Sequence, residues 1–576
     1  MLKLFRMLQP YRMLVSFVLL FVFLQSLSDL YLPTLLADIV DNGVVQGDNP
    51  YIWRIGGFML IIALAGGICS IGASFLSAKS AGGFGRDLRS RVFAHVEKYS
   101  LHEFDQVGTA SLITRTTNDI TQVQQVLMMM MRVMVMAPMM CFGGIIMALY
   151  KDATLSLVII VIVPILALLI FAIVSRGVPL FKVMQVKIDK LNLVLRENLT
   201  GIRVIRSFNR TRHEQGRFNG ANMDLTDTAI KVNRIMASLM PIMMLVLNFA
   251  SIAIIWFGGL RIDSGSMQVG DLMAFIQYAW QIMFALIFAS MMFVMIPRAS
   301  ASAVRINGVL NMVPDIHDPS DAAAKPAAAR GELKFHNVSF HYPGAEMPAL
   351  SNISFSAGPG EVIAIIGGTG SGKSTLINLI PRFYDATSGS ITIGGIDVRE
   401  MTQEELRSGI GLVPQKAVLF TGTIADNIRF GKGDASDEEI RHAAVVAQAY
   451  DFVTEMKDGF DSPVAQGGSN VSGGQKQRLS IARALVRKPS IYLFDDSFSA
   501  LDFKTDAKLR AALRGETTEA TVLIVAQRVS TVMDADRIIV LDDGQISAIG
   551  THRELLQSST VYREIVTSQL SEEEIA

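Results

Sequence analysis

The sequence has little cysteine and little charge. Cys69 and Cys141 are its two cysteines in 576 residues, which excludes a disulfide framework and a cysteine metal cluster. Charged residues make up 18% of the chain and the mean hydropathy is +0.38, too apolar for an ordinary soluble protein or a disordered one. Because 52 basic residues are balanced by 52 acidic ones, no basic excess is present that would indicate nucleic-acid binding.

The net charge is zero because two parts of the chain carry opposite net charges that cancel. Residues 1–317 hold 27 Lys and Arg against 18 Asp and Glu, whereas the remaining residues hold 25 against 34. The chain is also too long for a single hydrophobic core. At least two chemically distinct domains are therefore expected.

The first part contains six apolar runs. Each is long enough to cross a bilayer core of about 30 Å, which takes about 20 helical residues. The first run is too long for a signal-peptide core and lacks a small-residue cleavage site, so we expect no cleavable signal peptide. We predict a six-span membrane domain over residues 1–317, with spans at 13–36, 56–78, 126–150, 155–174, 235–260 and 273–297.

The distribution of Lys and Arg predicts the orientation of these spans. Residues 79–125 hold six basic residues and residues 176–234 hold twelve, whereas the short loop 37–51 has none. Basic loops stay on the cytoplasmic side. Both termini and the two long loops are therefore predicted to be cytoplasmic.

The two long cytoplasmic loops have a helical pattern rather than a loop-like one. The first contains no proline and the second contains only Pro179, near its start, while apolar residues recur at helical spacing, as at Leu191, Val194, Leu195 and Leu199. Unstructured loops of this length are uncommon. We predict that the membrane helices continue into the cytoplasm, the alternative being ordinary soluble loops.

Two charged residues and many methionines lie within the spans. Asp29 and Arg132 are costly at such depth, so each either lines a water-filled cavity or forms a structural ion pair. Methionine clusters at residues 128–131 and 291–295. Flexible methionines suit a surface that repacks around varied apolar ligands, or they simply face lipid.

The second part is an α/β domain that follows a linker. Residues 318–330 are rich in Pro, Asp and Ala without apolar periodicity, which indicates a linker. The domain is predicted over residues 331–576. A short buried strand, EVIAII, leads into a glycine-rich loop and then an apolar helix.

This strand–loop–helix segment carries the pattern G-x-x-x-x-G-K-S of a phosphate-binding P-loop. Its glycines let backbone N–H groups surround phosphates at a helix N-terminus. Lys373 is placed to reach the β- and γ-phosphates of ATP, and Ser374 to bind Mg²⁺. The predicted ATP-binding residues are Gly367, Gly368, Thr369, Gly370, Ser371, Gly372, Lys373, Ser374 and Thr375.

A second buried strand predicts the rest of the magnesium site. It ends in Asp495-Asp496. A carboxylate at such a strand end is placed to hold Mg²⁺ directly or through water. We assign that role to Asp495.

The segment from Asn470 to Arg478, NVSGGQKQR, resembles the LSGGQ signature of ATP-binding-cassette (ABC) proteins. Other cassette motifs follow in the same order and spacing. The resemblance implies that Tyr342 stacks on adenine, that Gln415 is the Q-loop residue contacting Mg²⁺, that Asp502 belongs to the D-loop, and that Gln527 occupies the switch-histidine position. The signature residues that contact nucleotide are then Ser472, Gly473, Gly474 and Gln475.

The whole chain resembles an ABC exporter half-transporter, most closely the bacterial heterodimeric multidrug exporters. The resemblance implies the type I exporter fold, with coupling helices near residues 105–113 and 199–206, and a multi-pass location in the bacterial plasma membrane. It implies ATP-driven export of hydrophobic or amphipathic compounds. Export of lipids or peptides is the alternative, and an ATP-gated channel or sensor is a further one.

Three positions depart from the family pattern. Asp496 stands where a glutamate usually polarises the attacking water, and its carboxylate is one methylene shorter. Gln527 can donate a hydrogen bond but cannot carry positive charge. Gln466 replaces a glutamate before the signature, which affects a contact between cassette and coupling helices.

These departures predict an asymmetric pair of subunits. In ABC dimers each ATP lies between the P-loop of one cassette and the signature of the other. This chain's P-loop is expected to bind ATP and Mg²⁺ but hydrolyse slowly, because Asp496 and Gln527 weaken positioning and charge stabilisation. Its intact signature is expected to complete the competent site of a second, different half-transporter.

Overall fold

The computed structural model describes residues 2–319 and 331–570. The chain divides into two compact units: Met1–Glu97 with Gly108–Met312, and Lys98–Val107 with Val313–Ala576. Most of the predicted linker 318–330 lies outside the described residues. Of its described part, Asp318 accepts hydrogen bonds from the backbone N–H (2.9 Å) and Nε2 (3.2 Å) of Gln403.

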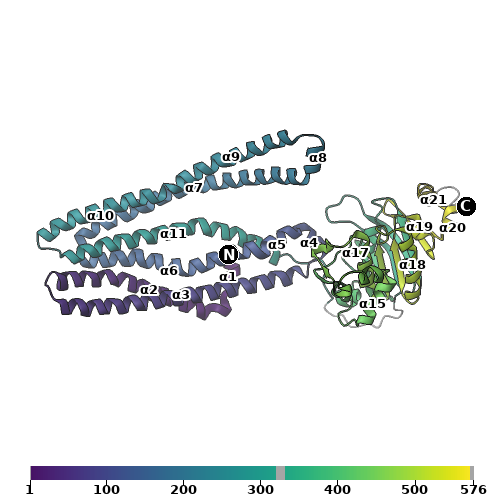
Figure 1. The fold of residues 1–576 in the computed structure, drawn as a ribbon, viewed down its shortest axis with the longest axis horizontal. Helices are drawn as coiled ribbons and strands as arrows, with labels where there is room; N and C mark the ends of the chain where they lie inside the picture. Colours follow the sequence, from purple (N-terminus) through teal and green to yellow (C-terminus); the bar gives the residue numbers. More distant parts are fainter. Residues whose placement is uncertain (1, 320–330, 571–576) are drawn as a thin grey trace. The chain divides into compact units, whose positions relative to one another are not determined.

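In the described residues of the first unit, helices joined by short turns are the sole secondary structure (Figure 1). Six helical stretches in the described part of the chain are long and apolar enough to cross a membrane, which confirms the predicted six-span fold. The elements are α1 (Leu2–Phe5), η1 (Arg6–Tyr11), α2 (Arg12–Asp38), η2 (Ile39–Val44), α3 (Asn49–Val96), α5 (Thr109–Thr114), η3 (Arg115–Asp119), α6 (Ile120–Lys151), α7 (Ala153–Thr200), α8 (Ile202–Ser207), α9 (Thr211–Ala237), α10 (Leu239–Asp263) and α11 (Val269–Leu310).

The long helices exceed the thickness of a bilayer, as the helical pattern of the loops predicted. Helices α3 and α7 have 48 residues each, about 72 Å at 1.5 Å per residue, against a hydrocarbon core of about 30 Å. In Figure 1, α7 and α9 run side by side to the short helix α8. The long basic loops are thus helical extensions of the spans.

Charged side chains hold the α7–α9 extension together. Arg217 Nη2 contacts Glu197 Oε2 at 2.8 Å, and Asn198 Nδ2 donates to Glu214 Oε2 at 3.0 Å. At the other end of α7, Asp152 accepts the backbone N–H of Thr154 and Leu155 as N-cap. Within the spans, polar contacts also join neighbouring helices, as where Thr34 Oγ1 lies 2.8 Å from the Tyr278 hydroxyl.

The second unit is an α/β cassette with two main sheets. The six-stranded sheet has the order β12-β11-β3-β10-β9-β6, with β12 alone antiparallel, and the four-stranded antiparallel sheet has the order β2-β1-β4-β5. The strands are β1 (Leu333–Phe340), β2 (Leu350–Ala357), β3 (Val362–Gly367), β4 (Ser388–Ile393), β5 (Ile396–Asp397), β6 (Ile410–Val413), β7 (Gly422–Thr423), β8 (Pro463–Val464), β9 (Ile491–Asp495), β10 (Thr521–Val525), β11 (Arg537–Asp542) and β12 (Gln545–Gly550).

The second unit also contains helices. They are α4 (Leu101–Val107), α12 (Lys373–Leu379), α13 (Gln403–Ser408), α14 (Ile424–Arg429), α15 (Asp437–Val446), α16 (Tyr450–Thr454), η4 (Gly459–Asp461), η5 (Gln466–Gly468), α17 (Gly473–Leu485), α18 (Phe503–Glu516), α19 (Val529–Val532), α20 (His552–Ser558) and α21 (Thr560–Thr567). Although α4 precedes the cassette in sequence by more than two hundred residues, it belongs to the same compact unit.

The central strand β3 separates two hydrophobic cores. Ile363 and Ile365 pack in one buried cluster together with residues of the four-stranded sheet, whereas Ala364 and Ile366 pack in another together with residues of α15 and α17. Alternate side chains of a strand point to opposite faces. The continuous apolar run EVIAII therefore reflects burial on both faces and fixes the position of the loop that follows.

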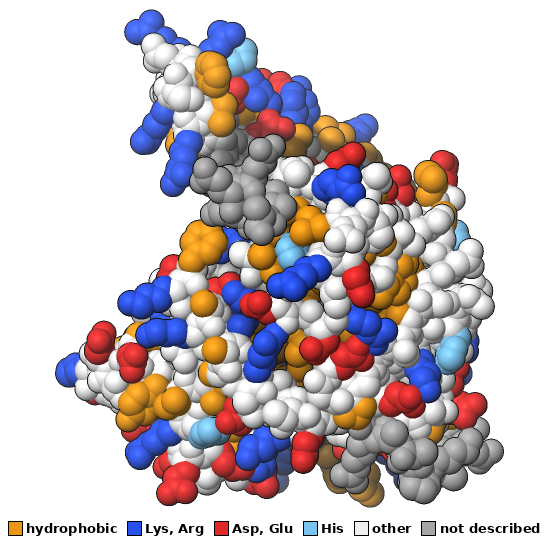
Figure 2. Space-filling model, turned by 90° about the vertical axis from the view of Figure 1, so that its right-hand side faces the viewer, with side chains coloured by type: hydrophobic (Ala, Val, Ile, Leu, Met, Phe, Trp, Pro, Cys, Tyr) orange, Lys and Arg blue, Asp and Glu red, His pale blue; other side chains and the backbone are white. Residues whose placement is uncertain are grey.

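The surface of the cassette carries charges of both signs. Figure 2 shows acidic and basic side chains interspersed over the face in view. Many are locally paired: Arg399 contacts Asp397 at 2.7 Å, and Lys432 contacts Glu439 at 2.6 Å. Part of the acidic charge of this half is therefore neutralised by neighbouring basic side chains.

Candidate functional site

The P-loop connects β3 to α12, and its glycines sit where side chains would not fit. Gly370 and Gly372 have φ values of 86° and 95°, a region that favours glycine. A Cβ on Gly372 would lie 2.7 Å from both Ala349 O and Leu350 Cδ2. The sequence folds here as a tight turn of exposed N–H groups at the start of a helix, which fits phosphate binding.

Lys373 lies inside this loop. Its Nζ donates to Gly367 O (2.9 Å), Gly368 O (2.6 Å) and Ser371 Oγ (3.3 Å). Burial lowers the pKa of the Lys373 ammonium, an effect opposed by the charges of Asp496 and Asp495. The positive charge is thus held where the loop would enclose a phosphate.

Two of the three predicted magnesium-binding residues meet beside the P-loop. Ser374 Oγ donates to Asp495 Oδ1 at 3.0 Å. Asp495 ends β9, and burial raises the pKa of its carboxyl. A hydroxyl and a carboxylate are oxygen ligands of the kind Mg²⁺ prefers, so this pair fits the ion.

The third predicted magnesium-binding residue, Gln415, lies against Asp496 instead. Its Nε2 donates to Asp496 Oδ2 at 3.3 Å, and Gln527 Nε2 donates to the same oxygen at 3.0 Å. Asp496 is buried and has a φ of 46°. Burial raises the pKa of its carboxyl, whereas the hydrogen bond from Gln415 lowers it. The two residues predicted as catalytic, Asp496 and Gln527, are therefore in direct contact.

The signature residues form a second group, at the start of α17. Ser472 is the N-cap: its Oγ accepts from Gln475 N at 3.3 Å, and Gln475 Oε1 accepts from Ser472 N at 2.9 Å. This reciprocal pair is a capping box. The backbones of Gly473 and Gly474 open the first turn, so the signature offers N–H groups and a hydroxyl at a helix N-terminus.

The predicted D-loop residue lies next to the signature. Asp502 caps α18 by accepting from Thr505 N at 2.9 Å, and this hydrogen bond lowers the pKa of the Asp502 carboxyl. A Cβ on Gly474 would lie 3.2 Å from Ala500 O. The signature and the D-loop segment therefore approach each other at Gly474 and Ala500, and Ser472 and Asp502 are both exposed.

Tyr342 lies beside the P-loop helix α12. Its hydroxyl is 3.0 Å from Thr375 Oγ1. The structure also brings Tyr384 against Tyr342, with ring centroids 5.4 Å apart. Sequence reasoning missed Tyr384, because 42 residues separate the two tyrosines and no spacing rule connects them.

Comparisons with known proteins agree with this geometry. Residues 15–286 match the family model of the ABC transporter transmembrane region, and residues 350–499 match that of the ABC transporter. An uncharacterized ABC transporter ATP-binding protein of Mycobacterium tuberculosis is 46% identical over 564 residues, which cover 97% of both chains. The chain belongs to the ABC transporter family.

Further relatives of this ABC transporter span nearly its full length. An uncharacterized ABC transporter ATP-binding protein of Bacillus subtilis, YfiB, is 40% identical over 569 residues, 98% of both chains. An ATP-dependent lipid A-core flippase of Chromobacterium violaceum is 32% identical over 542 residues, 93% of this chain and 92% of the flippase. The solved structure of a bacterial Atm1-family ABC exporter with ATP bound superimposes with a TM-score of 0.81 at 27% identity, covering 97% of this chain and 99% of that one.

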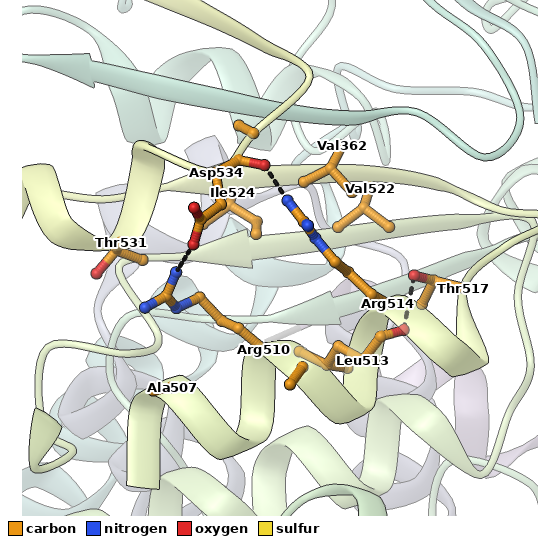
Figure 3. Close-up of a pocket in the computed structure, with 12 residues that line it drawn as sticks. Val362, Ala507, Arg510, Leu513, Arg514, Thr517, Val522, Ile524, Thr531 and Asp534 are labelled. Carbon is orange, nitrogen blue, oxygen red and sulfur yellow. Dashed lines mark hydrogen bonds and ion pairs between the residues drawn. The ribbon is translucent and has the colours of Figure 1, made fainter. Parts of the chain in front are cut away.

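The transporter also has a pocket of about 340 Å³ that contains none of the sequence-predicted site residues (Figure 3). Apolar side chains of β3 and β10 line it on one side and α18 on the other. Its polar groups already pair with each other: Arg510 Nη1 contacts Asp534 Oδ2 at 3.2 Å, and Arg514 donates to the Asp534 carbonyl. Its lining shares no residue with the predicted nucleotide site.

The two charged residues of the transporter's spans lie on α2 and α6. Arg132 is half-buried and forms no ion pair within residues 2–319 and 331–570. Asp29 is also half-buried, and its backbone carbonyl accepts from Gln281 Nε2 at 2.8 Å. Of the two alternatives predicted for Arg132, the structural ion pair is therefore not found among the described residues of this chain.

Proposed function

We propose that this chain is one half of a heterodimeric ATP-driven exporter and that its own P-loop site binds ATP and Mg²⁺ but hydrolyses ATP slowly. The observation that carries the proposal is the pair Asp496–Gln527 beside an otherwise complete P-loop. Lys373, Ser374 and Asp495 supply the groups for binding. Asp496 and Gln527 are less suited to hydrolysis than the glutamate and histidine that the family usually has at these positions.

Asp496 is a poor candidate for activating water. Its carboxylate is one methylene shorter than that of glutamate, and a misplacement near 1 Å can cost about 100-fold in rate. The oxygen Oδ2 is also occupied by two amide donors, from Gln415 and Gln527. A carboxylate that anchors two glutamines has one oxygen fewer with which to orient water.

Gln527 weakens the same site electrostatically. A phosphoryl-transfer transition state spreads negative charge over its oxygens, and positive groups stabilise it. A glutamine amide donates a hydrogen bond without a charge. Because both defects fall on one site, two copies of this chain would have two slow sites, which is why we assign it a different partner.

The intact signature gives this chain a role at the partner's site. Ser472 and Gln475 form a complete capping box at the start of α17, and Asp502 lies beside them. These residues complete the ATP site of a partner that supplies the glutamate and histidine. Hydrolysis at that site, coupled through the helical extensions, would reorient the membrane unit between two arrangements.

Hydrophobic or amphipathic compounds are the proposed cargo, in the manner of multidrug efflux. The methionine-rich spans support this choice, because flexible side chains adapt to varied ligands. Lipid export is the second candidate, favoured by the 32% identity with proteins described as ATP-dependent lipid A-core flippases. ATPase stimulation across a panel of drugs and of lipids separates the two, and a response to lipids alone favours the second.

The asymmetric assignment is tested on the assembled pair in vesicles. Lys373→Ala in this chain and the matching change in the partner are compared for ATP turnover and for ATP-dependent export of a loaded dye. The partner's variant should abolish both activities, whereas Lys373→Ala should leave a measurable fraction. Equal losses would overturn the asymmetry, and gradient-driven dye release without uphill transport would indicate an ATP-gated channel.

A further inference from the structure

Three aromatic rings from separate segments meet beside the P-loop helix. Phe340 ends β1, Tyr342 follows two residues later, and Tyr384 follows α12. The ring centroids are 4.9 Å apart for Phe340 and Tyr342, and 5.4 Å apart for each of the other two pairs. These distances are typical of interacting aromatic pairs, so the three rings form one cluster.

Tyr342 is held on several sides within this cluster. Its hydroxyl reaches Thr375 Oγ1 on α12 at 3.0 Å. The rings of Phe340 and Tyr384 meet its own at interplanar angles of 80° and 82°. Both neighbours meet Tyr342 in T-shaped pairs, and the Tyr342 side chain is still only half-buried.

Tyr384 is itself a fixed ring rather than a mobile surface residue. It is half-buried and packs against the buried cluster between the two sheets. Burial, and then the nearby charge of Asp105 on α4, raise the pKa of the Tyr384 phenol, so the hydroxyl stays neutral at physiological pH. A ring that is fixed and uncharged can restrict the orientation of a ring that packs against it, here that of Tyr342.

We propose that Tyr384 is a positioning residue for the nucleotide base: its ring sets the plane of Tyr342, on which the adenine of ATP stacks. This inference rests on the proposed function, since it assumes that the P-loop of this chain binds ATP. Tyr384 contacts Tyr342, and Tyr342 contacts the base. Loss of the Tyr384 ring therefore weakens recognition of the base while leaving recognition of the phosphates to the P-loop.

The test compares two ligands that share the phosphate chain and differ in the base. Equilibrium binding of Mg-ATP and of Mg-tripolyphosphate is measured on the assembled pair, with the P-loop lysine of the partner changed to alanine so that binding at this chain's site dominates. Tyr384→Leu should raise the Kd for ATP about 2- to 10-fold, the range given by one aromatic pair. The Kd for tripolyphosphate should not change.

Two further variants keep the proposal falsifiable. Tyr384→Phe preserves the ring and should bind ATP like the unmodified chain. Tyr450→Leu removes an aromatic ring that packs on Phe460, with centroids 6.1 Å apart, and should affect neither ligand. Equal weakening of both ligands by Tyr384→Leu, or no weakening of ATP, would overturn the proposal. If the unmodified chain binds neither ligand, the proposed ATP site itself fails instead.

Discussion

Gln527 Nε2 donates a 3.0 Å hydrogen bond to Asp496 Oδ2. The two positions at which this chain departs from the family's catalytic pattern are therefore partners of each other. Their contact joins the end of β9 to the end of β10, neighbouring parallel strands with Val525 paired to Asp495. A change at one position consequently alters the environment of the other, and the two should be changed together.

Asp496→Glu combined with Gln527→His should raise the basal ATPase activity of the assembled pair. The longer carboxylate extends toward the position of the attacking water, and histidine adds a positive charge, so the slow site should gain roughly 10- to 100-fold. The measurement is steady-state phosphate release from the pair in nanodiscs. Adding Lys373→Ala should remove the gain, and an unchanged rate in the double variant would mean that the slow step lies elsewhere.

Gly474→Ala should slow hydrolysis at the partner's site rather than at this chain's own. The added Cβ would lie 3.2 Å from Ala500 O, so the contact between signature and D-loop must shift. ATP turnover of the pair should fall at least about 10-fold, in keeping with the sensitivity of positioned chemistry. ATP retained at this chain's P-loop, measured by filter binding, should stay near its original level; its loss would contradict the division of roles.

Gly372→Ala should weaken ATP binding at this chain's P-loop. Gly372 has a φ of 95°, and a Cβ would lie 2.7 Å from Ala349 O, so alanine is both strained and crowded there. We expect the Kd for Mg-ATP to rise more than about 10-fold. Gly433→Ala is the matched control, because nothing lies within 4 Å of its added Cβ. A similar loss of ATP binding in the control would show that the effect is not specific to Gly372.

Glu361 and Arg537 should make the stability of the cassette pH-dependent. Burial raises the pKa of Glu361, but hydrogen bonds from Arg537 and from Gly358 N–H outweigh it and hold the pKa below its ordinary value of 4.5. A depressed carboxyl pKa contributes stability that is present above about pH 4.5 and is lost as the pH falls through the lower folded-state pKa. Glu361→Gln should therefore lower the Tm at pH 7.

The difference in Tm between the unmodified pair and Glu361→Gln should shrink as the pH is lowered below 4.5. Thermal unfolding in nanodiscs at pH 7 and pH 4 provides the measurement. Glu346→Gln, for which no partner contributes a comparable hydrogen bond in the described residues, serves as the control. A Tm difference that does not depend on pH would assign the effect of Glu361 to packing.

Local patterns were sufficient for much of this fold. The six spans were predictable because each must bury its backbone polar groups within one apolar helix. The P-loop was predictable because its glycines and lysine stand within a few residues of each other, between a buried strand and a helix. The helical extensions, such as α7, followed from apolar periodicity that continues beyond the span.

The sequence by itself determined the spans, the P-loop, the signature and the unusual residues Asp496 and Gln527, since each is encoded in one short segment. Only the tertiary structure decided that Gln415 and Gln527 share one oxygen of Asp496, that Tyr384 contacts Tyr342, and that α4 belongs to the cassette unit. Those contacts join segments dozens to hundreds of residues apart. Such pairs are set by strand order and helix packing, which no local spacing rule records.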